Sequence, residues 1–132
     1  MATKDRITCH VLDTTLGKPA RGVRVKLELT PPPPPPPRVF ESQTDEDGRI
    51  QVWLPYSSAT SSGEVPVYTL EDVLGEKGSS RWTLRFDTAT YFGGEDKTFF
   101  PEVTIVFTVQ HGQRYHVPLL LAPFSYSTYR GS

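Results

Sequence analysis

Apolar and polar residues alternate with a period of two through most of the chain, which is the pattern of β-strands that bury one face. In residues 23–29 the alternation is strict, with apolar residues on one side and charged residues on the other. The same alternation marks residues 7–12, 50–54, 81–87, 103–109 and 114–121, and a last short strand is expected in residues 125–129. Seven or eight short strands separated by turn signals predict an all-β sandwich.

Glycines mark two of the breaks between these strands. Asp47-Gly48 is a turn signal that leads into the strand near Arg49. Residues 88–92 predict one turn of helix, because Gly93-Gly94 follows and glycine commonly ends helices. In the strand that follows Asp47-Gly48, the alternation places three apolar residues inward, namely Ile50, Val52 and Leu54.

Two segments interrupt the pattern of strands and are interpreted as insertions into a single domain spanning residues 1–132. The insertion at residues 31–38 begins with seven consecutive prolines, which cannot donate sheet hydrogen bonds and favour an extended polyproline II arm. We interpret it as a solvated extension, the alternative being a ligand for an SH3 or WW domain. The insertion at residues 57–80 is rich in serine, glycine and charge, which predicts a long mobile loop with a turn of helix at residues 67–74.

Composition excludes several classes of function. The net charge is −1, so the chain lacks the positive field that nucleic acid or an anionic membrane surface would require. No apolar run reaches the roughly 20 residues that span a bilayer, and the polar first residues predict no secretory signal. Cys9 is the single cysteine and shares the parity of the apolar residues, so we expect a small buried side chain without a disulfide.

Three polar residues point outward if the apolar residues of each strand point into the sandwich: His10, His116 and Arg49. Arg49 shares this outward parity with Gln51 and Trp53. Two imidazoles and a guanidinium held on strands could form a site on an outer sheet face. The alternative is that they are ordinary surface residues, and parity alone does not decide between the two.

Other chemistries lack their motifs in this sequence. It contains no HExxH, CxxC or carboxylate cluster for a metal, no GxSxG elbow and no glycine-rich phosphate loop. Cys9 and His10 are neighbours on a predicted strand, so their side chains face opposite ways. The residues therefore give no support for a metal site.

Several segments together resemble the 5-hydroxyisourate hydrolase family, and the resemblance covers nearly the whole chain. They are ITCHVLD at residues 7–13 with GKPA at 17–20, TDEDGR at 44–49, FFPEV at 99–103, YHVPLLL at 115–121, PF at 123–124 and YSTYRGS at 126–132. The final Tyr-Arg-Gly-Ser distinguishes such enzymes from transthyretin, a hormone carrier of the same fold. The two insertions depart from the family pattern, as does Cys9, where a small hydroxyl residue is more usual.

The resemblance implies an eight-stranded transthyretin-like β-sandwich with one short helix, assembled as a homotetramer (a dimer of dimers) around a central channel. It implies hydrolysis of 5-hydroxyisourate to 2-oxo-4-hydroxy-4-carboxy-5-ureidoimidazoline in urate catabolism, without a cofactor. The family's functional residues match His10, Arg49 and His116, and the tail adds Tyr129 and Ser132. The two histidines would then be the base and proton-handling pair. Arg49 would hold the developing oxyanion or the ring edge, and Tyr129 and Ser132 would orient the substrate and the water.

Two other functions stay open from the sequence. One is a transthyretin-like carrier that binds a small aromatic ligand without reaction, because a fold does not fix a function. The other is an interaction scaffold built on the proline run. For the compartment we expect the cytoplasm, with the peroxisome as the alternative, because such enzymes occur in both.

Overall fold

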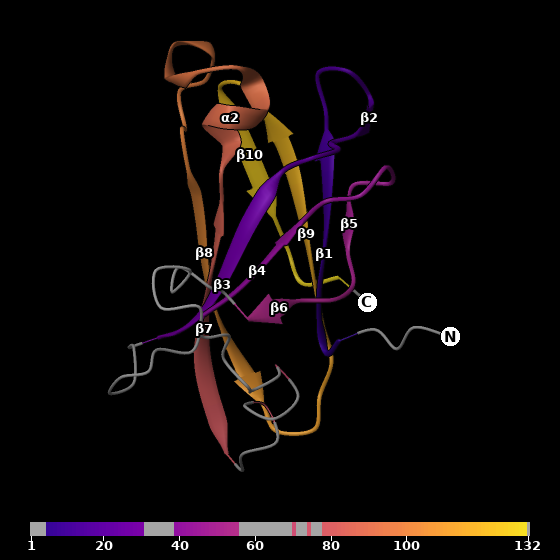
Figure 1. The fold of residues 1–132 in the computed structure, drawn as a ribbon, viewed down its shortest axis with the longest axis vertical. Helices are drawn as coiled ribbons and strands as arrows, with labels where there is room; N and C mark the ends of the chain where they lie inside the picture. The colour runs from indigo at the N-terminus through magenta and orange to yellow at the C-terminus, as the bar shows by residue number, and fades with distance from the viewer. Residues whose placement is uncertain (1–4, 31–38, 56–69, 71–73, 75–77, 132) are drawn as a thin grey trace, which may run out of the picture.

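Two five-stranded sheets pack face to face in the computed structural model, which describes residues 5–30, 39–55, 70, 74 and 78–131 (Figure 1). The first sheet has the order β10-β9-β1-β2, with β5 paired to β1. Its strands are β1 (Ile7–Asp13), β2 (Lys18–Pro19), β5 (Arg49–Ile50), β9 (Tyr115–Ala122) and β10 (Ser125–Thr128). The second sheet has the order β6-β4-β3-β7-β8. Its strands are β3 (Arg24–Thr30), β4 (Val39–Gln43), β6 (Leu54–Pro55), β7 (Ser79–Phe86) and β8 (Val103–Gln110).

The core lies between the two sheets and contains most of the inward residues that the alternation identified. In β1 every second residue from Ile7 to Asp13 is buried, and β9 buries Val117, Leu119 and Leu121 on the same side. Complete burial of one such aliphatic side chain contributes roughly 1.5–3 kcal/mol. The predicted all-β sandwich is confirmed, and the alternation places the polar residues of β1 and β9 on the outer face of the first sheet.

The strands β1 and β9 lie side by side and are parallel, whereas all other strand pairs between the named strands are antiparallel (Figure 1). Their register pairs Thr8 with His116 and His10 with Pro118. Because alternate residues of a strand share a face, this register brings polar residues more than a hundred positions apart onto one outer surface.

The inward and outward assignment of the 50–54 segment was wrong after its first residue. β5 ends at Ile50, and the inward prediction holds for Ile50 but fails for Val52 and Leu54, which are 45% and 65% exposed. Trp53 points inward instead and is only 4% exposed. Its indole N–H donates to the carbonyl of Ile7 at 2.8 Å. The large ring buries more apolar area than either neighbour and satisfies its one polar group there, which overrides strict alternation.

The predicted helical turn is confirmed as α2 (Thr88–Phe92). The Asp87 side chain accepts from the Thr90 N–H at its start, and Gly93 ends it with a φ of 95°. The predicted turn at Gly48 is also present, with a φ of 73°. A Cβ at Gly48 would lie 2.3 Å from the Val11 carbonyl oxygen, so only glycine fits between this turn and β1.

The two predicted insertions are described only in small part. The proline run lies outside the described residues. In the second insertion, Leu70 and Leu74 are helical and buried in the core, and β7 already begins at Ser79. At these two described positions, apolar side chains of the segment add to the packing of the sandwich.

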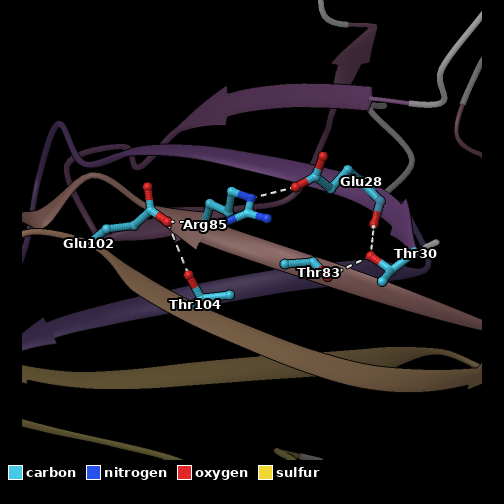
Figure 2. A network of polar contacts seen from close by, with 6 residues as sticks. All are labelled: Glu28, Thr30, Thr83, Arg85, Glu102 and Thr104. Atoms are coloured by element: carbon cyan, nitrogen blue, oxygen red, sulfur yellow. Dashed lines mark hydrogen bonds and ion pairs between the residues drawn. The ribbon is translucent and has the colours of Figure 1, made fainter. Parts of the chain in front are cut away.

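The outer face of the second sheet carries cross-strand ion pairs. Arg85 on β7 donates to Glu28 on β3 and, at 3.1 Å, to Glu102 just before β8 (Figure 2). Hydrogen bonding to Glu28 is the main factor that raises the pKa of the Arg85 guanidinium. Exposed pairs of this kind contribute at most about 1 kcal/mol each, so we interpret this face as a solvated one.

No helix in the described residues is long and apolar enough to cross a membrane.

Candidate active site

His10 and His116 lie together on the outer face of the first sheet. Their ring centroids are 6.4 Å apart, with an angle of 37° between the ring planes. Both residues are partly buried, His10 on β1 and His116 on β9. Rigid neighbouring strands therefore hold two imidazoles at a spacing that a small molecule or a water can bridge.

Thr8 orients His116 across the β1–β9 pair. The Thr8 hydroxyl lies 2.8 Å from Nδ1 of His116. A hydroxyl can either donate or accept. The Thr8 hydroxyl can therefore donate to an unprotonated Nδ1 or accept from a protonated one, and it holds the ring in both cases. The imidazole can thus gain a proton without losing this partner.

Asp47 orients His10 through its backbone. Nε2 of His10 lies 2.9 Å from the Asp47 carbonyl oxygen. A carbonyl can only accept, so Nε2 carries a proton and, in the neutral ring, Nδ1 is the basic nitrogen. The same turn is held by Asp45, whose carboxylate accepts the N–H groups of Asp47 and Arg49.

Arg49 stands opposite His10 in the antiparallel pairing of β1 with β5. Its side chain is exposed and lines a cavity of about 290 Å³. The wall of this cavity also includes Asp5, Arg6, Thr8, Cys9, Gln51, Arg114, Tyr115, His116 and Gly131. Three arginines against one aspartate give the cavity a positive character, which suits an anion or a developing negative charge.

Cys9 is fully buried among the core side chains between the sheets, as predicted. Burial raises the pKa of its thiol, so the sulfur stays protonated and is a poor nucleophile. Within the described residues, no three His, Cys, Asp or Glu side chains are grouped as metal ligands.

Of the two tail residues assigned from the resemblance, the structure describes only Tyr129. Tyr129 is 58% exposed and lines a neighbouring hollow of about 300 Å³ between β8 and β9, which His116 also lines. Ser132 lies outside the described residues. The structure thus brings together His10, Arg49 and His116, and the catalytic roles assigned to all five residues stay predictions.

Sequence reasoning missed two residues that contact His116. Thr8 shares the outward parity of His10, and a search along that face of β1 could have found it. Gly131 pairs with His116 in an isolated antiparallel bridge, and its N–H donates to the His116 carbonyl oxygen at 2.8 Å. No alternation marks this contact, because the chain has left β10 before it returns to β9.

Comparison with known proteins assigns the chain to a family. A model of the HIUase/Transthyretin family matches residues 7–131. The chain is 37% identical over 130 residues to a probable 5-hydroxyisourate hydrolase of Schizosaccharomyces pombe, which covers 96% of this chain and 90% of that protein. It is 40% identical over 129 residues to the uric acid degradation bifunctional protein TTL of Arabidopsis thaliana, covering 96% of this chain but only 37% of that longer protein.

A solved structure agrees with the sequence comparisons. The 5-hydroxyisourate hydrolase of Klebsiella pneumoniae superposes with a TM-score of 0.64 at 27% identity, covering 96% of this chain and 98% of that one. The family match, the sequence identity and the shared sandwich agree over almost every residue. The chain belongs to the HIUase/Transthyretin family.

Proposed function

We propose that this protein hydrolyses 5-hydroxyisourate to 2-oxo-4-hydroxy-4-carboxy-5-ureidoimidazoline, a step in urate breakdown. The observation that carries the proposal is the pair of imidazoles, with centroids 6.4 Å apart, on the face that also presents Arg49. The relatives from Schizosaccharomyces pombe and Klebsiella pneumoniae bear the name of this activity. A carrier would need neither a paired acid and base nor a cation beside them.

The reaction adds one water across a cyclic amide-like C–N bond. Water loses a proton to a base as it attacks the carbonyl carbon, and the carbonyl oxygen becomes negative. The C–N bond then breaks as the nitrogen takes a proton from an acid. The ring opens to a carboxylic acid that stays attached to the product and releases its proton to become a carboxylate. The reaction therefore requires a base, an acid and a stabilised oxyanion.

The imidazoles of His10 and His116 supply the base and the acid in this proposal. The basic nitrogen of His10 is Nδ1, since Nε2–H is held by the Asp47 carbonyl. Nδ1 of His116 is held by Thr8, so proton exchange with a bound molecule would use Nε2. The Thr8 hydroxyl can accept from Nδ1 once the ring is protonated, which stabilises the imidazolium.

Arg49 is the candidate for stabilising the oxyanion. An arginine guanidinium is a planar cation that offers several donors in one plane. Arg49 lines the cavity that His116 also lines, so a carbonyl attacked there develops its charge near a cation. Arg6 and Arg114 extend the positive surface, which favours binding of a group that becomes a carboxylate.

We further propose that the protein works as a homotetramer, a dimer of dimers with isologous contacts. The candidate site lies on an outer sheet face, where solvent would screen Arg49 in a single chain. Apolar side chains lie on or near the same sheet: Leu120 is only partly buried, and Phe124 between β9 and β10 is 76% exposed. A second subunit over this face would cover these side chains, exclude water and strengthen the electrostatic interactions of the site.

Isotope labelling tests the reaction directly. Freshly generated 5-hydroxyisourate is mixed with the purified protein in ¹⁸O-labelled water, and the product is analysed by mass spectrometry. Hydrolysis at the ring carbonyl predicts one labelled oxygen in the new carboxylate, formed faster than without protein. Binding of the substrate without faster formation of labelled product would instead identify a carrier.

A further inference from the structure

We propose that Arg130 and Gly131 act as a C-terminal clamp that positions the imidazole of His116. This inference rests on the proposed function, because it assigns a role in that reaction to two residues outside the candidate catalytic set. Gly131 is the part of the clamp that touches the ring, and Arg130 is the part that anchors the tail. The C-terminal end of the chain lies beside β1 and β9 (Figure 1).

Gly131 lies against the His116 ring so closely that a larger residue does not fit. A Cβ at position 131 would lie 2.6 Å from Cδ2 of His116, 3.3 Å from its Cγ and 3.1 Å from Cγ of Pro118. Gly131 is not among the described glycines with positive φ, so an alanine there would bring no backbone strain. Glycine is therefore required at this position by contact with the imidazole, not by the conformation of the backbone.

Arg130 anchors the tail on a fixed aromatic ring. Its Cζ lies 4.5 Å from the centroid of the Tyr115 ring, an arrangement typical of a cation–π contact. Tyr115 is buried, and its hydroxyl accepts the backbone N–H of Gln110 at 2.8 Å. Tyr115 precedes His116 in β9, so the anchor holds the next residue of the tail directly beside the imidazole.

The imidazole is thus held on two sides. Thr8 holds Nδ1, and the Gly131 backbone packs against Cδ2 and Cγ. Cδ2 is bonded to Nε2, the nitrogen that would exchange a proton with the substrate. A ring shift of a few tenths of an ångström at this edge would therefore displace Nε2, and proton transfer is sensitive to such displacements.

The test is Gly131→Ala in the full-length protein, with Ser127→Ala as the control. Ser127 belongs to the same C-terminal segment but pairs with Leu120, away from His116. For Gly131→Ala we expect kcat to fall about tenfold or more while KM changes by less than about threefold. The NMR signals of the His116 ring and its titration curve should shift in Gly131→Ala and stay in place in Ser127→Ala.

A second pair of variants tests the anchor and covers the case in which Gly131→Ala does not fold. Arg130→Leu should shift the His116 signals and lower kcat, and Arg130→Lys should restore both in large part, because it keeps a cation over Tyr115. Unshifted His116 signals in Gly131→Ala, or in Arg130→Leu, would overturn the clamp even if activity fell. An inactive wild-type protein would overturn the proposed function instead, and the ring signals would still test the clamp.

Discussion

The carbonyl oxygen of Asp47 lies 2.9 Å from Nε2 of His10, so the turn that leads into Arg49 also sets the tautomer of a candidate catalytic imidazole. Asp45 holds this turn by accepting from the N–H groups of Asp47 and Arg49. The orientation of the His10 ring and the backbone position of Arg49 thus both depend on the carboxylate of Asp45. This coupling predicts that the base and the oxyanion-stabilising group are lost together if the turn is disturbed.

The first prediction concerns the imidazoles. His10→Ala and His116→Ala should each lower kcat by roughly a hundredfold, the usual contribution of a positioned acid or base. The control is His111→Ala, which removes the third histidine from the exposed turn between β8 and β9. Steady-state kinetics on the purified variants provides the measurement. Turnover near the wild-type level in either site variant would remove that histidine from the mechanism.

The second prediction concerns Arg49. Arg49→Ala should lower kcat by about a hundredfold or more, because the oxyanion loses the cation that stabilises it. Arg49→Lys keeps a cation but not the planar fork of donors, so it should recover only part of the lost kcat. The matched control is Arg85→Ala on the opposite sheet, which should leave turnover unchanged. That control should cost at most about 2 kcal/mol of folding free energy, since both of its ion pairs are exposed. Equal activity of Arg49→Ala and Arg85→Ala would contradict the assignment.

Much of the fold and half of the site follow from the period-two alternation. It identified the long strands and placed His10 and His116 outward, because burial of one sheet face forces every second residue inward. It failed at Trp53, where the size of one ring outweighs the alternation. It places Thr8 on the outward face but does not pair it with His116, because no local pattern encodes the register between residues 108 positions apart.

The third prediction concerns alkaline stability. Burial and the hydrogen bond to Asp13 raise the pKa of Tyr91 to about 12, from an ordinary value of 10.0. The folded state therefore keeps the phenol proton longer than the unfolded chain does. The resulting stabilisation is complete below about pH 10 and is lost as the pH rises from about 10 to about 12.

Substitution of Tyr91 separates its contribution to the free energy of unfolding from the contributions of other groups that titrate in the same pH range. Tyr91→Phe should show a shallower loss of unfolding free energy than wild type between pH 9 and pH 12, measured by urea denaturation at about five pH values. Tyr126→Phe, which removes an exposed hydroxyl on β10, serves as the control and should keep the wild-type slope. Equal slopes for the two variants would contradict the prediction.

The fourth prediction concerns assembly. Leu120 lies on the outer face of the first sheet and pairs with Leu12 across β1 and β9. A glutamate there would place a charge in the proposed subunit contact, so Leu120→Glu should weaken assembly and turnover together. Light scattering and kinetics over a dilution series measure both properties. A fully active monomer would contradict the proposed arrangement of the site between subunits.

The most direct test of the central claim is the decay of freshly generated 5-hydroxyisourate, followed by ultraviolet absorbance at neutral pH with a chelator present. The account predicts that wild-type protein accelerates the decay far above the spontaneous rate, and that the chelator makes no difference. It also predicts that Arg49→Ala, folded and assembled, returns the rate most of the way to the spontaneous one. Decay at the spontaneous rate in the presence of folded, assembled wild-type protein would contradict it.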